Sequence, residues 1–308
     1  MRANIGTELE QIMTPTALRS IARAGIASLA AALLVACGAI GPSSTGVIDN
    51  SAIGQPDFRK HVATYGVVYR LPVDATDALD NRINSQLKRD LLRLGLQTEA
   101  LLPNIPHVTV VHIHSADRST PRKMLAALPK PPGPVRVTLK GFYTTEAAKD
   151  AGRPWWLDLG IVKAGPGFEA MMAFNTATTA AMAPLRDGPL PRVTGPVYAR
   201  MGDAGKELVR TVGVSGVNVI KDGKELRSHN PHNTLVYSMT PFTPALQASM
   251  KEMADKFNAA MPEGIETTFN TVSIVELAFA GNVTREIYRI SLIDGSVTDA
   301  ETGRAVGR

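Results

Sequence analysis

The chain has 308 residues, of which 44% are hydrophobic, 20% charged and 5% aromatic, and its formal net charge is +5. This is the composition of a globular protein, and it excludes the disordered, collagen-like and coiled-coil classes. The one cysteine excludes a disulfide framework and a multi-thiolate zinc or iron–sulfur site within one chain. The modest charge, with no block of Lys and Arg, favours anionic ligands and predicts no stable nucleic-acid complex.

A targeting signal is expected before the folded body of the chain. Residues 24–36 form a short apolar run that follows Arg19 and Arg23 and ends directly before Cys37. A basic flank, a run too short to span a bilayer and a processing site are typical of a secretory signal peptide. The tetrapeptide Leu34-Val35-Ala36-Cys37 resembles the lipobox of bacterial lipoproteins, which implies lipidation of Cys37. The other interpretation, a buried cysteine at the end of a helix, leaves the basic flank unexplained.

The signal divides the chain into three parts. Residues 1–37 are the expected lipoprotein signal peptide, 38–60 a flexible tether rich in Gly, Ser and Pro, and 61–300 the folded body. Turn-forming residues near 184–230 predict an insertion in the body. The lipid anchor predicts a membrane-bound protein of the cell envelope that faces the periplasm.

The residues around the signal refine this expectation. Gly38, instead of the Asp that is associated with inner-membrane retention, favours the outer membrane. Glu8 and Glu10 do not suit the basic end of a signal peptide, so translation from Met13 is an alternative to Met1.

Strands and helices are intermixed along the body. β-branched and alternating apolar residues predict strands at 64–72, 104–114, 135–142, 155–162, 232–239, 267–281 and 285–292. Helical spacing predicts helices at 77–94, 120–128, 167–182 and 244–257, and Lys221-Asp222-Gly223 predicts a hairpin. This order, with a hairpin-length join at the end, favours an α+β fold over a doubly wound parallel sheet.

One pattern occurs twice, 125 residues apart. Pro106-His107-Val108-Thr109-Val110 and Pro231-His232-Asn233-Thr234-Leu235 both read P-H-x-T-apolar at the start of a predicted strand. Positions i and i+2 of a strand share a face, so each histidine points the same way as its threonine. The sequence therefore predicts two half-sites, each with one imidazole and one hydroxyl.

Two such half-sites facing each other suit the chemistry of a phosphoester. In-line displacement at phosphorus needs a base on the attacking oxygen and an acid on the leaving oxygen, and two imidazoles near neutral pKa can serve. The hydroxyls of Thr109 and Thr234 are expected to donate to the non-bridging oxygens. This mechanism requires no metal and no cofactor.

The paired H-x-T motifs on strands are similar to those of the two-histidine (2H) phosphoesterase superfamily, and the resemblance covers about residues 61–295. It implies two pseudo-symmetric lobes, each an antiparallel sheet with outer helices, around a central cleft that holds His107, Thr109, His232 and Thr234. It also implies metal-independent action on a cyclic or 2′-5′ linked phosphodiester. The motifs lie further apart than is usual in the family, which leaves the substrate open.

Four other side chains bear on the site. Trp156, which shares a strand face with Asp158, and Tyr69 are further candidates for substrate binding through base stacking. His112 and His114 share a face and could form a zinc pair, but strand parity turns them away from His107 unless a bulge intervenes. A structural role for these two histidines is therefore preferred.

These observations predict a monomeric cyclic phosphodiesterase, with His107 and His232 catalytic and with a small nucleotide or another small phosphodiester as substrate. Hydrolysis is expected rather than RNA ligation, because RNA ends are not expected outside the cytoplasm. The alternative is a non-catalytic envelope lipoprotein that uses the same fold to bind a phosphorylated ligand.

Overall fold

A computed structural model describes residues 63–146, 155–186, 219–221, 224–227, 230–238, 240, 242–278 and 281–308. The expected signal peptide, Cys37 and the tether lie outside the described residues, as does most of the expected insertion, residues 187–218. Among the helices in the described part of the chain, none has the length and apolarity that a bilayer crossing demands.

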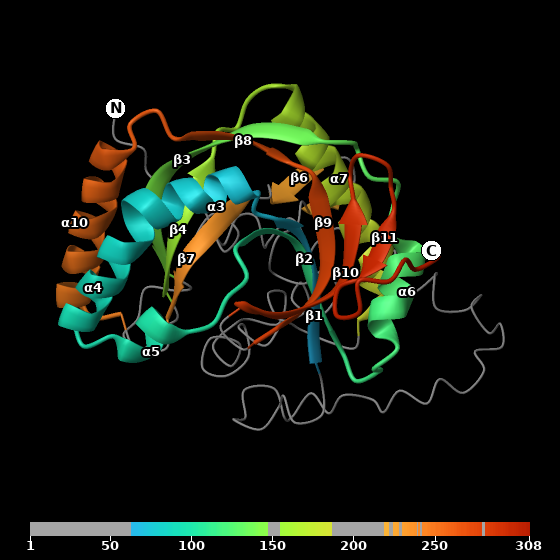
Figure 1. Ribbon diagram of the computed structural model, residues 1–308, viewed down its shortest axis with the longest axis horizontal. Helices are drawn as coiled ribbons and strands as arrows, with labels where there is room; N and C mark the ends of the chain where they lie inside the picture. Colours follow the sequence, from blue (N-terminus) through green and yellow to red (C-terminus); the bar gives the residue numbers. More distant parts are fainter. Residues whose placement is uncertain are drawn as a thin grey trace, which may run out of the picture.

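The fold is α+β, and its centre is one antiparallel sheet of nine strands in the order β11-β10-β9-β1-β2-β7-β4-β3-β8 (Figure 1). The strands in sequence order are β1 (Ala63–Arg70), β2 (His107–Ser115), β3 (Val135–Glu146), β4 (Trp155–Ile161), β7 (His232–Tyr237), β8 (Ile265–Phe269), β9 (Thr271–Leu277), β10 (Val283–Ser291) and β11 (Val297–Asp299). A separate hairpin is made by β5 (Val219–Lys221) and β6 (Lys224–Arg227), where the sequence predicts one.

The expected pair of separate, pseudo-symmetric lobes is not confirmed. The described strands instead form one continuous sheet, because β2 and β7 pair with each other through Val108 and Asn233. This is the only register pair between these two strands, whereas β1 and β2 pair along their whole lengths. The sheet therefore has a narrow join at its centre, between the two strands that begin with the H-x-T motifs.

Most helices lie where the sequence predicts them. They are α3 (Val73–Leu79), a π-helical turn (Asp80–Asn84), α4 (Ser85–Arg93), α5 (Gln97–Leu101), α6 (Thr120–Ala127), α7 (Pro166–Met182), a 3₁₀ turn (Ala183–Leu185) and α10 (Pro244–Ala260). Helix α10 begins where predicted, because Thr243 Oγ1 accepts the backbone N–H of Leu246 and Pro244 occupies the first turn. The first helix begins at Val73, four residues before the predicted Asp77.

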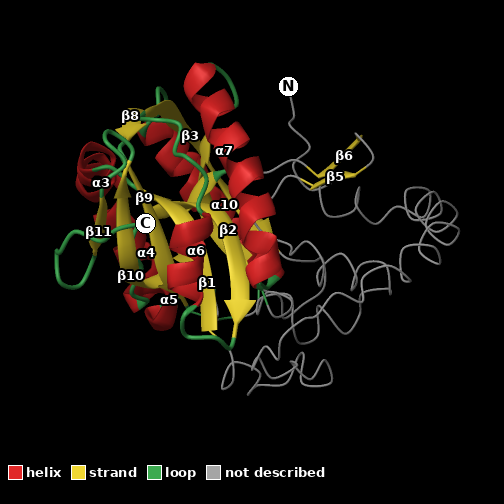
Figure 2. Ribbon diagram, turned by 90° about the vertical axis from the view of Figure 1, so that its right-hand side faces the viewer, coloured by secondary structure: helices red, strands yellow, loops and turns green. Residues whose placement is uncertain are grey.

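The helices cover the sheet and close the core. Helix α7 packs on β2 and β3 (Figure 2), and the contacts also join α10 to β3, α5 to β7 and α6 to β9. Gly167 allows α7 to approach closely, because a Cβ there would meet the backbone oxygen of Arg136. The core lies on the face of the sheet that carries Tyr65, Val67 and Tyr69 of β1, and these side chains are at most 2% exposed.

Two boundaries differ from the sequence-based prediction. The strand expected at 267–281 is two strands, β8 and β9, which are separated by Asn270 and lie in different parts of the sheet. Both strands are rich in β-forming residues, so the sequence does not show that the chain changes its neighbouring strand between them. The body also extends past residue 300, because Thr298 pairs with Ala305 and the N–H of Val306 donates to the carbonyl of Val297.

Truncation of Phe269 tests this core. Its side chain is fully buried, and its ring centroid lies 5.5 Å from that of Tyr69. We expect Phe269→Ala to lower the free energy of unfolding by about 3–5 kcal/mol, since a cavity replaces a packed ring. Ile293→Ala is the control, because Ile293 is 72% exposed and its truncation should change stability by less than about 0.5 kcal/mol. Equal losses in urea denaturation would contradict this packing.

Candidate active site

The join between β2 and β7 brings the two H-x-T motifs together. Val108 pairs with Asn233 in antiparallel register, so His107 lies across from Thr234 and Thr109 across from His232. Residues that face each other across an antiparallel pair project to the same side of the sheet. All four predicted side chains therefore project from one face, on adjacent strands. The Asn233 amide strengthens the join, because its Oδ1 accepts the backbone N–H of His107 at 3.2 Å.

Each motif is followed by a β-bulge. On β2 the register with β1 shifts between Thr109 and Val111, and on β7 the register with β4 shifts between Thr234 and Val236. One extra residue in a strand reverses the facing of all residues after it. The sequence argument turned His112 and His114 away from His107 unless a bulge intervened, and the structure has that bulge: the extra residue Val110 returns both to the motif face.

The two catalytic candidates are held by the same local contact. The Nδ1 atom of His107 lies 2.7 Å from the carbonyl oxygen of Ile105, and that of His232 lies 2.7 Å from the carbonyl oxygen of Asn230. A carbonyl only accepts, so each Nδ1 carries the proton of that hydrogen bond. In the neutral ring the lone pair is then on Nε2, the atom that is left for proton transfer.

A buried carboxylate lies beside the second motif. Asp158 of β4 pairs in register with Thr234 and is 1% exposed. Its Oδ1 accepts the Thr234 hydroxyl at 2.6 Å and lies 3.8 Å from Nε2 of His232, while its Oδ2 accepts the Thr145 hydroxyl at 2.8 Å. The His232 side chain is 34% exposed, so this imidazole bridges the buried carboxylate and the surface.

The contact with Asp158 changes the expected role of one threonine. The sequence predicts that both motif hydroxyls donate to the oxygens of a phosphoester. In the structure the Thr234 hydroxyl donates to Asp158, so only its oxygen lone pairs remain for another partner. The Thr109 hydroxyl lies 3.4 Å from Nε2 of His112, and either atom can supply that proton.

The first motif faces a tyrosine from the strand of the second. The Tyr237 hydroxyl lies 3.5 Å from Nε2 of His107, and the two rings are nearly parallel, with an interplanar angle of 17°. His107 is 2% and Tyr237 6% exposed. Gly66 of β1 leaves space for the neighbouring His112, because a Cβ on Gly66 would lie 3.0 Å from the His112 ring.

The two aromatic candidates have different positions. Trp156 shares the motif face, as the sequence predicts, since it pairs with Tyr237 and stands two residues from Asp158. Tyr69 projects to the opposite face, because it pairs with Val108 and not with a motif residue. Its ring is fully buried against Phe174 and Phe269, and burial raises the pKa of its hydroxyl far above the ordinary value. The assignment of Tyr69 to the substrate site is therefore wrong.

Sequence reasoning missed Asp158, Thr145 and Tyr237 as parts of this site. Asp158 and Tyr237 lie on predicted strands, but the bulges and the strand partners that turn them toward the motifs are not visible in one sequence. A buried Asp in an otherwise apolar strand, WWLDLGI, is the one signal that was present.

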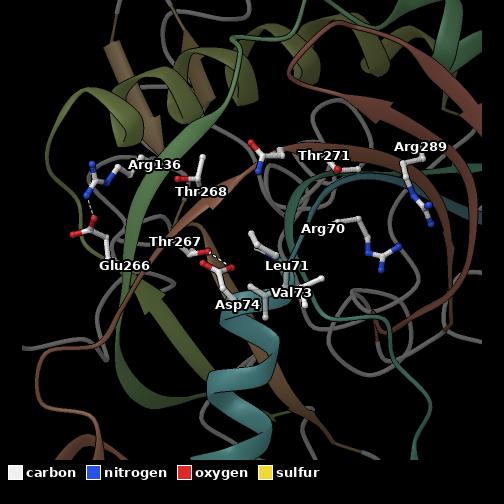
Figure 3. Close-up of a pocket in the computed structure, with 12 residues that line it drawn as sticks. Arg70, Leu71, Val73, Asp74, Arg136, Glu266, Thr267, Thr268, Thr271 and Arg289 are labelled. Carbon is white, nitrogen blue, oxygen red and sulfur yellow. Dashed lines mark hydrogen bonds and ion pairs between the residues drawn. The ribbon is translucent and has the colours of Figure 1, made fainter.

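A separate pocket of about 720 Å³ lies at the end of β1, and none of the predicted site residues lines it (Figure 3). Three arginines from three strands border it: Arg70, Arg136 and Arg289. Arg136 is paired with Glu266, and the Thr267 hydroxyl donates to Asp74 at 2.9 Å. The pocket is thus a polar hollow whose charges are largely neutralised by their neighbours.

Glu286 organises the arginines on one side of this pocket. Its Oε2 lies 2.6 Å from Arg70 Nη1 and 2.5 Å from Arg289 Nη2, and its Oε1 accepts the Ser273 hydroxyl at 2.5 Å. Burial alone would raise the pKa of Glu286, but the hydrogen bonds from Arg289 and Ser273 and the charge of Arg70 hold it below the ordinary value of 4.5. The carboxylate is thus favoured by the folded state.

Replacement of Glu286 should alter stability in a pH-dependent way. A depressed pKa in the folded state contributes stability that is complete above the unfolded-state pKa and is lost as pH falls through the folded-state pKa. We expect Glu286→Gln to cost about 1–3 kcal/mol at pH 7, and the difference from wild type to shrink as the pH falls below 4.5. Thermal unfolding of the wild type and the variant, at pH 7 and at a pH below 4.5, measures this difference in stability. A constant difference would contradict the ionised role of Glu286.

The described residues contain no cluster of three or more His, Cys, Asp or Glu side chains that could hold a metal ion. His114 instead lies near the strand β1, with its Nδ1 3.4 Å from both the Thr64 hydroxyl and the Ala63 carbonyl oxygen.

Comparison with known proteins adds little to this geometry. No protein-family model matches the sequence. No curated protein matches it either. Among solved structures, Usb1 of Kluyveromyces marxianus is similar over 73% of this chain and 97% of its own, with 10% sequence identity and a TM-score of 0.32. A likeness of this size carries no functional argument, so the assignment rests on the site itself.

Proposed function

We propose that the protein is a phosphodiesterase that hydrolyses a 2′,3′-cyclic or 2′-5′ linked phosphodiester with two imidazoles as acid and base. The observation that carries this proposal is the register of β2 and β7, which sets His107 and His232 on one face of adjacent strands. In both rings Nδ1 is hydrogen-bonded to a backbone carbonyl oxygen, which supports Nε2 as the atom that transfers the proton. Their resemblance to the paired motifs of the 2H phosphoesterases supports the substrate class.

The mechanism follows from this arrangement. One Nε2 takes the proton of the attacking water, whose oxygen bonds to phosphorus, and the other Nε2 gives its proton to the oxygen of the ester bond that breaks. In this proposal the Thr109 hydroxyl donates to a non-bridging oxygen. Trp156, on the same face, offers a surface on which a base can stack. Every step uses side chains of the chain itself, so the proposed reaction proceeds without a metal.

The activity assay uses the full chain in mild detergent, 2′,3′-cyclic mononucleotides and EDTA. We expect turnover, and we expect His107→Ala and His232→Ala each to reduce it by about 10²- to 10⁴-fold, because each removes one proton transfer. Thr109→Val should cost less, since one hydrogen bond is lost. Release of the acyclic monophosphate, followed by chromatography, measures the rate.

His114→Gln is the matched control for these variants. His114 lies on the same strand and face as His107 but seven residues away, next to Thr64. Activity close to wild type is expected for it. Turnover abolished by the chelator would contradict the metal-free mechanism. A folded wild-type protein that turns over no cyclic or 2′-5′ linked substrate would instead favour the alternative, a non-catalytic module that binds a phosphorylated ligand.

We also propose that the enzyme acts in the cell envelope, anchored through a lipid on Cys37. The support is the sequence alone: the apolar run, its basic flank and the lipobox-like tetrapeptide. Cys37→Ala should abolish incorporation of an alkyne-tagged fatty acid in a bacterial host and release the protein from the membrane fraction. The anchor would be contradicted if the wild type took up no label and if Cys37→Ala stayed in the membrane fraction as the wild type does.

A further inference from the structure

We propose that the hollow at the end of β1 is an anion subsite, which binds a second phosphate group of the substrate beside the phosphodiester that the two histidines cleave. The inference rests on the proposed function and narrows its substrate class. It starts from a strand register that joins the hollow to the motif face: Arg70, which borders the hollow, pairs with His107.

The pairing of Arg70 with His107 brings their side chains close. The N–H of Leu71 donates to the carbonyl of Pro106 at 3.1 Å, so the adjacent residues of the two strands form a non-hydrogen-bonded pair. In such a pair the Cα atoms are about 4.5 Å apart, and the side chains project to the same side of the sheet. Arg70 is therefore the neighbour of His107 on β1, as Thr234 is its neighbour on β7.

The arginines on this side of the hollow keep a positive charge. Arg70 and Arg289 share the single carboxylate of Glu286, whose other oxygen accepts the Ser273 hydroxyl. Two guanidinium groups and one carboxylate carry one positive charge in excess. The register of β9 with β1 and β10 places Ser273, Glu286 and Arg289 on the motif face as well. The excess charge therefore lies on the same face as the two histidines.

Arg70 also has donors to spare. Of the five N–H groups of a guanidinium, those of its Nη1 serve Glu286 at 2.6 Å, and its Nη2 has no partner among the described residues. The buried Nε has none either. Because the side chain is 29% exposed, its Nη2 edge can donate to a ligand without releasing Glu286.

Neutral donors line the same hollow where the chain passes from β8 to β9. Thr268, Asn270 and Thr271 border it, and their side chains make no hydrogen bond to any described residue. Hydroxyl and amide groups beside arginines are a common set of ligands for phosphate oxygens. The hollow thus combines an excess positive charge with uncommitted neutral donors.

Acidic groups restrict where an anion can bind. The Asp74 carboxylate borders the hollow and would repel an anion, and Arg136 is neutralised by Glu266. Figure 3 shows Arg136 and Glu266 together on one side, Arg70 and Arg289 on the other, and Asp74 between them. The phosphate is therefore assigned to the side of Arg70 and Arg289.

The position of this subsite sets the size of the substrate. The guanidinium of Arg70 reaches across β9 to Glu286 on β10, so it lies roughly two strand spacings, about 10 Å, from β2. One nucleotide can bridge such a separation. The substrate is thus assigned two phosphate groups: one that the histidines cleave, and one that the arginines hold. The second is a terminal monoester or the next diester of a chain.

The test compares substrates with the full chain in mild detergent: a 2′,3′-cyclic mononucleotide, its 5′-phosphorylated form, and a dinucleotide that ends in a 2′,3′-cyclic phosphate. We expect a second phosphate to lower KM by about 10- to 100-fold with kcat little changed, because the contact is equal in the ground and transition states. A lower KM for the phosphorylated mononucleotide identifies a terminal monoester, and a lower KM for the dinucleotide alone identifies a chain diester. Equal KM values for all these substrates would overturn the inference.

Arg289→Gln should reduce this difference in KM to less than about threefold, because it removes one of the two charged donors. Arg285→Gln is the matched control. Arg285 lies on the same strand and pairs with one carboxylate, that of Glu276, but it does not border the hollow. The difference in KM should persist in this control. Its full retention in folded Arg289→Gln would contradict the subsite.

A second measurement needs no turnover. The full chain with ¹⁵N-labelled arginine is titrated with inorganic phosphate, and with sodium chloride at the same ionic strength. The Nε–H signals of Arg70 and Arg289 should shift with one saturation curve in phosphate, while that of Arg285 stays. Signals that do not move, or that respond equally to chloride, would overturn the inference even in an active enzyme. The expected shifts in a protein without turnover would support the subsite and contradict the proposed function, so the two can fail separately.

Discussion

The position of one half-site relative to the other depends on a single backbone pairing, between Val108 of β2 and Asn233 of β7. The neighbouring strands β1 with β2 and β4 with β7 pair over several residues each, so the join between the two halves of the sheet is narrow by comparison. The Asn233 side chain reinforces it by accepting the His107 N–H. A shift of one residue at this join would turn one imidazole to the opposite face and separate the pair.

The motif face is polar although much of it is buried, and the cost of that burial is offset by pairing. Asp158, Thr234, His107 and Tyr237 are all at most 6% exposed, and each has a hydrogen-bonding or ring partner in the structure. Polar groups buried in this way hold one defined arrangement, because every alternative leaves an unpaired donor or acceptor. The similar motifs thus acquire different surroundings: a tyrosine hydroxyl at His107 and a carboxylate at His232.

The sequence predicts the α+β class and most strands and helices, because these follow from local periodicity and from residue types. The sequence does not predict the features that depend on which strands pair with each other. The bulges at Val110 and Leu235 reverse the facing of His112 and Tyr237, and their only signal is the register with a neighbouring strand. Tyr69 shows the same limit, since alternation places it on a face but does not say which face is the core. The sequence around Asn270 is an unbroken β-rich run, although the strand ends there and a new strand with other neighbours begins.

The central claim is that both imidazoles address one bound phosphoryl group. Titration of the ¹⁵N-histidine-labelled protein with orthovanadate, which mimics a pentacoordinate phosphorus, tests it most directly. The account predicts that the signals of His107 and His232 shift together, with one saturation curve, while His114 is unaffected. Responses that saturate at different concentrations, or a response of one histidine alone, would contradict it.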